Sequence, residues 1–274
     1  MPRHPARALR ELTIDRLSID DERSFRHVPL YGALREVLAR DRYVFRVLPA
    51  KSSGRWDRAL LLNLTYWGGV GGDVLESDRI PADVVTHAAW HHLAARALGL
   101  ADGAAPSAEA LFLGESIASA FDIYLVGRLL GRAPGSSFLA TQVSAMAEAA
   151  RAAGLGQGGF ASLLRAAASD PEAAFSRLRE LLYDATLALF ESRGPDEGLA
   201  ALARFDGHRL GALLHHYELS NWVLYARAYA SNARGPGRRA RAVDAKLRAA
   251  PDALAWLTSA WVARPPLVAP RRRG

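Results

Sequence analysis

Two histidines and one glutamate are spaced in a way that suits a metal ion. His87 and His91 lie four residues apart in the run IPADVVTHAAWHHLAARALG, so on a helix both imidazoles project from the same face. Glu115 follows near the start of the next apolar run, LFLGESIASAFDIYLVGRLL, where it could supply a carboxylate. Two imidazoles and a carboxylate, with a fourth position left open, form a ligand set that zinc accepts. The sequence therefore predicts a zinc site at His87, His91 and Glu115.

The helices that must carry these residues are marked by signals at their ends. Pro81 and Asp83 suit the first turn of a helix, and Gly99 suits its end. The loop LADGAAPS separates this helix from a second one, predicted from about 108 to 130. Helical spacing continues through segments separated by Gly, Pro or Asp, which we predict as helices over 138–153, 159–168, 171–192, 198–205 and 208–232.

The N-terminal part is expected to differ from this helical pattern. Residues 30–40 show helical spacing, whereas 43–48 and 59–67 are short runs typical of strands, separated by a turn-forming stretch at 49–54. An antiparallel pair of strands is the simplest arrangement of these two runs. The following loop, GGVGGD, matches no phosphate-binding pattern, so we interpret it as a connection. The predicted fold class is mainly α (α+β), with a small N-terminal β element.

We expect one mainly helical domain over 1–233. It would comprise a lead-in at 1–80, the helix pair at 81–131 and a helical part at 132–233. Most of the excess positive charge lies beyond residue 231, where the sequence contains nine arginines and one lysine but only two aspartates. We interpret 234–274 as a basic, partly mobile tail containing one short apolar helix at about 253–263. No recognition-helix motif accompanies these charges, so nucleic-acid binding is not expected.

Composition restricts the chemistry and the location. The chain has no cysteine, so any metal must be held by His, Asp or Glu. The first residues, MPRHPARALRELTIDRLSIDDE, contain no apolar run of signal-peptide length. The apolar stretch 117–130 is interrupted by charged residues and is shorter than a membrane span. These observations predict a cytoplasmic protein that does not contact a membrane.

The helix pair resembles the gluzincin class of zinc metallopeptidases, in which a helix with HExxH precedes a helix that brings a third ligand, a glutamate. The resemblance rests on HAAWH and on GESIASAFD, and it implies that His87, His91 and Glu115 bind zinc. Ala88 stands where the family has the glutamate that acts as general base. The resemblance therefore implies an inactive or repurposed peptidase-like protein, a pseudoenzyme. If it is an enzyme, it would be a metal-dependent hydrolase with a non-standard general base.

Two further residues of the second helix are expected to support the ligands. Ser119 occupies the position at which the family often has an aspartate behind the zinc ligands. Asp122, seven residues after Glu115, returns to the same helix face and could orient a histidine.

A second group of histidines gives rise to an alternative interpretation. His208, His215 and His216 precede Tyr217, and His208 and His215 would share one face of a helix. Under the resemblance, His215 or Tyr217 could approach the open metal position and stabilise an oxyanion. Alternatively, the chain is a helical-bundle metalloprotein with His and carboxylate ligands from facing helices.

A third interpretation involves no metal. His87 and His91 would then hydrogen-bond across a helix interface in an interaction or regulatory protein. Such a protein could dock a protein partner through the basic tail or through an aromatic stripe formed by Tyr217, Trp222, Tyr225 and Tyr229.

Overall fold

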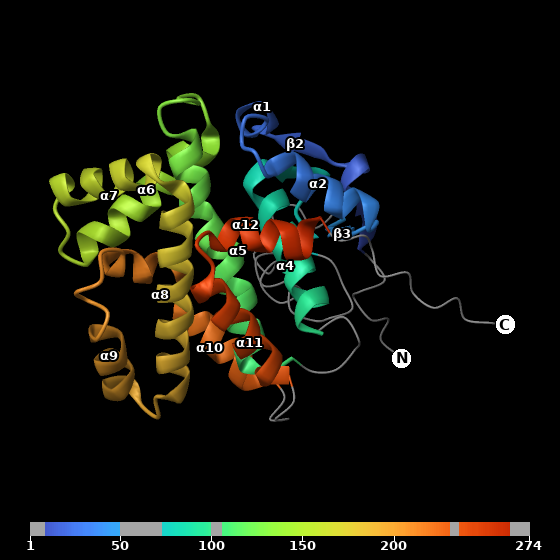
Figure 1. The fold of residues 1–274 in the computed structure, drawn as a ribbon. Helices are drawn as coiled ribbons and strands as arrows, with labels where there is room; N and C mark the ends of the chain where they lie inside the picture. Colours follow the sequence, from blue (N-terminus) through green and yellow to red (C-terminus); the bar gives the residue numbers. More distant parts are fainter. Residues whose placement is uncertain (1–8, 50–72, 100–105, 231–235, 264–274) are drawn as a thin grey trace.

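One long apolar helix, α5 (Ala108–Leu129), lies at the centre of the fold (Figure 1). The computed structural model describes residues 9–49, 73–99, 106–230 and 236–263. The Ser107 side chain caps α5 by accepting a hydrogen bond from the Ala110 backbone N–H. Within the described residues α5 is the one helix long and apolar enough to cross a membrane, but 94% of its apolar window is buried. This degree of burial is typical of a helix in the core of a protein.

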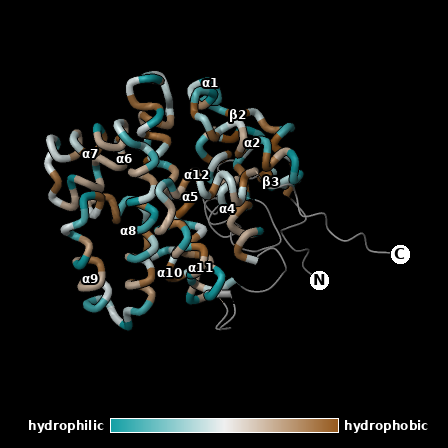
Figure 2. Tube along the Cα trace, in the orientation of Figure 1, coloured by the Kyte–Doolittle hydropathy of each residue, from teal (hydrophilic) through white to brown (hydrophobic). Residues whose placement is uncertain are grey.

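In the part of the chain that the structure describes, six helices pack around α5. They are α4 (Ala82–Leu98), α6 (Ser137–Ala152), α7 (Gln157–Ser169), α8 (Pro171–Glu191), α10 (Leu219–Tyr229) and α11 (Pro236–Ala249). The prediction of a mainly helical protein is confirmed, and most predicted helices are present with ends shifted by a few residues. Figure 2 shows hydrophilic and hydrophobic residues alternating along the outer helices α6, α7 and α8, as expected when one face of a helix is buried.

Local sequence explains where α8 and α6 begin and why α5 and α7 can pack closely. Asp170 caps α8 by accepting a hydrogen bond from the Ala173 N–H, and Pro171 occupies the first turn. The Ser136 side chain caps α6 in the same way. Gly127 of α5 lies so close to the Ala167 carbonyl of α7 that a Cβ atom would overlap it. Glycine is therefore required where these two helices meet.

The N-terminal region forms two small sheets. It contains β1 (Arg10–Thr13), β2 (Ser18–Asp20), α1 (Glu22–Phe25), α2 (Tyr31–Arg40), β3 (Val44–Val47), β4 (Val74–Leu75) and β5 (Arg79–Pro81). Strand β3 pairs with β1 in antiparallel and with β4 in parallel orientation, while β2 pairs with β5 in parallel. The strand predicted at 59–67 and residues 68–72 of the glycine-rich loop lie outside the described residues. The predicted helix at 30–40 and the predicted strand at 43–48 are both present.

The helix predicted at 208–232 is divided in the structure. A 3-10 turn, Gly211–Tyr217, comes first, and α10 starts at Leu219. Glu218 between them has a left-handed φ of 48°, which ends one helix and starts the next. The Asn221 side-chain amide donates to the Glu218 carboxylate at 2.6 Å and holds this corner. The prediction of one continuous helix was wrong because polar contacts at Glu218 outweigh the helical spacing.

The C-terminal segment belongs in part to the folded body. Helix α11 packs on α5, and α12 (Ala253–Leu257) continues into a wide π-helical turn, Thr258–Val262. Asp244 of α11 forms an ion pair with the fully buried Arg179 of α8. The short apolar helix predicted at 253–263 is present. The packed helix α11 was not predicted, and its signal was apolar residues such as Ala240 and Leu247, which lie among many charges and belong to the core.

Candidate metal centre

The three predicted ligands converge between α4 and α5. His87 and His91 project from one face of α4, and their Nε2 atoms lie 3.0 Å apart. The Nε2 atom of His91 lies 3.6 Å from a carboxylate oxygen of Glu115 on α5. One ligand atom from each of the three side chains falls within 4.8 Å of the others. The group could therefore hold a metal ion.

Small residues allow the two helices to approach closely enough for this. A Cβ atom on Gly114 would lie 3.5 Å from the Cβ of Ala94, in ordinary contact. The edge-to-face pair of Trp90 and Phe121, with centroids 5.5 Å apart, packs the same interface. The separation of the helices is set by such contacts, which places Glu115 opposite His91.

Two of the three separations between ligand atoms can be compared with the geometry of a bound metal ion. Two nitrogens bound to tetrahedral zinc at ordinary bond lengths lie about 3.3 Å apart. The separations of 3.0 Å and 3.6 Å lie on either side of this value. A shift of a few tenths of an ångström would bring these two separations to that value, and the third lies within 4.8 Å. The residues present therefore fit a divalent ion held by two nitrogens and one oxygen.

Burial sets the protonation of the ligands. It lowers the pKa of His87 to about 4 and that of His91 to about 3, so both imidazoles are neutral at pH 7. Burial, together with the charges of Asp73 and Asp122, raises the pKa of Glu115 to about 8. A hydrogen bond from Ser119 opposes this shift only in part. Without a cation, Glu115 therefore carries a proton at neutral pH. A bound cation would favour its ionised form.

The two predicted supporting residues occupy different places. Ser119 hydrogen-bonds to Glu115 and so contacts a predicted ligand. Asp122, also on α5, accepts a hydrogen bond of 3.3 Å from the Gln142 amide of α6. The same amide nitrogen lies 3.0 Å from Nε2 of His216. Asp122 is thus connected to the second histidine group through Gln142.

The residues adjacent to the ligands on α4 have other partners. His92 lies 2.8 Å from Asp41, which also pairs with Arg96, so its ring is directed away from Glu115 and into an ion-pair cluster. Burial lowers the pKa of His92, although Asp41 opposes the shift. Ala88 is buried in the core, with 1% of its surface exposed. Position 88 is therefore occupied by a closely packed core residue.

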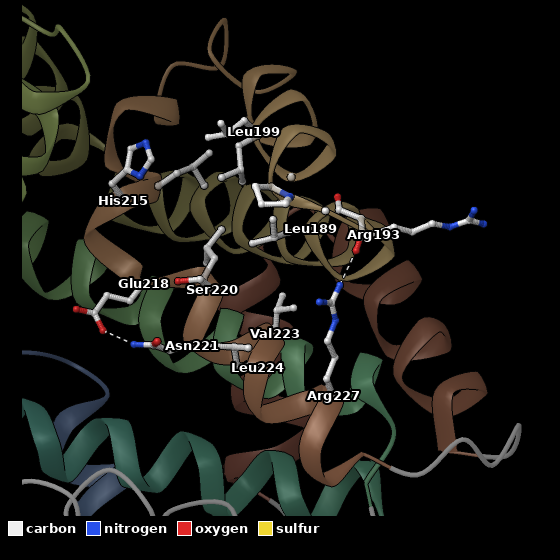
Figure 3. A pocket seen from close by; sticks show the side chains of 17 residues that line it. Leu189, Arg193, Leu199, His215, Glu218, Ser220, Asn221, Val223, Leu224 and Arg227 are labelled. Carbon is white, nitrogen blue, oxygen red and sulfur yellow. Dashed lines mark hydrogen bonds between the residues drawn. The ribbon is translucent and has the colours of Figure 1, made fainter.

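The second histidine group is distributed over three environments. His208 accepts a hydrogen bond from the Leu210 backbone N–H in the turn before the 3-10 segment. His215 is exposed and lines a groove between α8, α9 (Pro195–Ala203) and α10 (Figure 3). His216 contacts Gln142 instead. The shared helix face expected for His208 and His215 is absent because this segment is not one helix.

His215 and Tyr217, the two residues considered for oxyanion stabilisation, also lie in different environments. His215 faces the groove shown in Figure 3. Tyr217 is buried, and its hydroxyl has no hydrogen-bond partner among the described residues. Burial, together with the charge of Asp122, raises the pKa of Tyr217 well above its ordinary value. Of the two, Tyr217 is the one directed into the interior beside Asp122.

Sequence reasoning missed two acidic residues that influence the site. Asp83 lies four residues before His87, and its charge helps burial to raise the pKa of Asp122. The spacing 83, 87, 91 along α4 was the signal for it. Asp73 raises the pKa of Glu115 and has a raised pKa of about 6 itself, caused by burial. Its position after a glycine-rich stretch gave no signal of this role.

No protein-family model, no curated protein and no solved structure matches this chain.

Proposed function

We propose that this protein is a zinc-binding, metallopeptidase-like protein that lacks ordinary peptidase activity. The observation that supports the proposal is the convergence of the partly buried His87 and His91 with the buried Glu115 from two helices. Bound zinc would supply Lewis acidity, or structural cross-linking of α4 to α5. The two neutral imidazoles and the carboxylate of this chain would hold and orient it.

The lack of peptidase activity follows from the residue at position 88. Alanine has no group that accepts a proton, and this one is packed in the core. The neighbouring His92 is paired with Asp41 and so is not free to act as a base at the site. Neither Ala88 nor His92 therefore supplies the general base that hydrolysis at zinc needs.

A second candidate function rests on Asp73. Its pKa of about 6 suits a group that accepts a proton near neutral pH, and its charge acts on Glu115. The Tyr43 hydroxyl donates a 3.3 Å hydrogen bond to the Asp73 carboxylate and holds it in place. In this alternative the protein is a metal-dependent hydrolase in which Asp73 is the non-standard base. An Asp73→Asn variant that keeps its zinc but loses hydrolysis of an ester substrate would support it, whereas unchanged hydrolysis would exclude it.

The test of metal binding is the zinc content of protein purified without a histidine tag. Mass spectrometry should find about one zinc per chain in the wild type and little in His87→Ala or Glu115→Gln. The matched control is His92→Gln, because His92 is the adjacent histidine on the same helix and an amide can still donate to Asp41. This variant should keep its zinc.

Circular dichroism distinguishes loss of a ligand from loss of the fold. Equal helical signal in all four proteins, with zinc absent from the two ligand variants only, is the result expected. No zinc in the wild type, even after incubation with zinc salts, would contradict the proposal. The metal-free helical interaction protein would then be the better interpretation.

A further inference from the structure

A second, separate cavity lies at the C-terminal end of α4. It has a volume of about 420 Å³, opens to the surface and is lined by α4, α11, α12 and the π-helical turn. This size falls within the range of small-molecule pockets. None of the candidate metal ligands lines it. The cavity is therefore a separate site, and a ligand bound there would be independent of the proposed metal function.

The floor of this cavity is apolar and aromatic. Leu93 and Ala97 of α4 form one wall, while Trp256 and Trp261 form another, with ring centroids 6.5 Å apart. Trp261 lies in the π-helical turn, closed by the Ala263 N–H bonding to the Thr258 carbonyl at 2.9 Å. Such wide turns occur frequently at functional sites because they displace side chains from regular helical positions. An apolar ring system would find flat surfaces here.

The rim of the cavity is cationic. Arg96, Arg239 and Lys246 line it, and no acidic side chain does so among its described residues. Arg96 is already paired with Asp41. Arg239 and Lys246 form no ion pair with any residue in the described ranges, so no described acidic side chain neutralises their charges.

The guanidinium of Arg239 lies beside the end of α4. Its Nη1 atom lies 2.9 Å from the point that a Cβ atom on Gly99 would occupy. Gly99 ends α4 with a φ of +78°, which favours glycine. The absence of a side chain at this residue thus leaves space for the guanidinium beside the cavity.

We propose that this cavity binds a small anion with an apolar aromatic body, such as an aromatic carboxylate, sulfonate or phosphate. The two tryptophans would contact the ring system, and Arg239 and Lys246 would pair with the anionic group. Charge complementarity and the limited volume favour this ligand over a protein segment or a cationic molecule.

The probe for the test is 8-anilinonaphthalene-1-sulfonate, whose fluorescence rises in apolar surroundings. The comparison probe is N-phenyl-1-naphthylamine, which has the same aromatic body without the charge. Wild-type protein should bind the sulfonate at one site. In the double variant Arg239→Gln with Lys246→Gln its dissociation constant should rise about tenfold, because two charge-assisted contacts are lost. Binding of the neutral probe should stay within about twofold.

Two further variants complete the experiment. Arg238→Gln removes the adjacent arginine of α11, which is exposed and does not line the cavity, and it should leave both probes unaffected. Trp256→Ala removes part of the floor and should weaken both probes together. The proposal is overturned if the double variant binds the sulfonate as tightly as the wild type. It is also overturned if Arg238→Gln weakens the sulfonate as much as the double variant does.

Discussion

Zinc binding should become tighter as the pH rises from 6 to 8, and Glu115→Gln should remove this dependence. In the metal-free protein Glu115 has a pKa of about 8, so it must release a proton before its carboxylate can bind a cation. The two imidazoles, with pKa values of about 4 and about 3, are already neutral at pH 6 and release none. Of the three ligands, only Glu115 therefore contributes to the pH dependence.

The magnitude follows from the protonated fraction. With a pKa of about 8, about 99% of Glu115 is protonated at pH 6 and half at pH 8. The ionised fraction therefore rises about fifty-fold, and the zinc dissociation constant should fall by the same factor. An exposed glutamate would already be ionised at pH 6 and would contribute almost nothing.

The assay is competition for zinc against a chromophoric chelator of known pH dependence. The wild type and Glu115→Gln are compared at pH 6, 7 and 8. The variant should bind more weakly at pH 8 and show an almost flat profile, because a neutral amide has no proton to lose. A variant that keeps the fifty-fold slope would show that another group titrates, and the assignment of Glu115 would be wrong. A wild type with a flat profile would show that its carboxyl is ionised throughout.

Three further predictions concern stability. Asp244→Ala should lower the free energy of unfolding by about 1–3 kcal/mol in urea titrations, because the buried Arg179 loses one of its two ionic partners among the described residues and keeps only Glu180; an unchanged free energy of unfolding would contradict this. Gly127→Ala should cost about 1–3 kcal/mol by overpacking against Ala167, and an unchanged melting temperature would refute the close approach. In the metal-free protein, the stability contributed by neutral Glu115 is complete below its unfolded pKa near 4.5 and is lost as the pH rises through its folded pKa of about 8. Glu115→Gln should therefore flatten the pH dependence of the free energy of unfolding between these two values.

Much of the helical framework could be predicted from local signals. Pro81 and Gly99 delimit α4, and Asp170 marks the start of α8, because caps act within one turn and depend little on distant residues. The segment 208–232 could not be predicted in the same way. Its break depends on the left-handed conformation of one residue, Glu218, which is held by the Asn221 side chain, and neither glycine nor proline marks this position in the sequence.

The candidate site was only half determined by the sequence. The i, i+4 spacing of His87 and His91 already requires their side chains to meet on any helix. No local rule fixes which residue of α5 lies opposite them, since that depends on how two helices pack. The structure places Glu115 there, consistent with the predicted ligand set.

The sequence by itself determined residue types, helix ends and the pairing of residues within one turn. Only the tertiary structure decided which groups are buried, and therefore that Glu115 carries a proton at pH 7 while His87 and His91 do not. It also brought Arg239 of α11 beside Gly99 of α4, and two tryptophans onto the same cavity. Burial and long-range contacts are collective properties of the packed chain, so spacing along the sequence does not encode them locally.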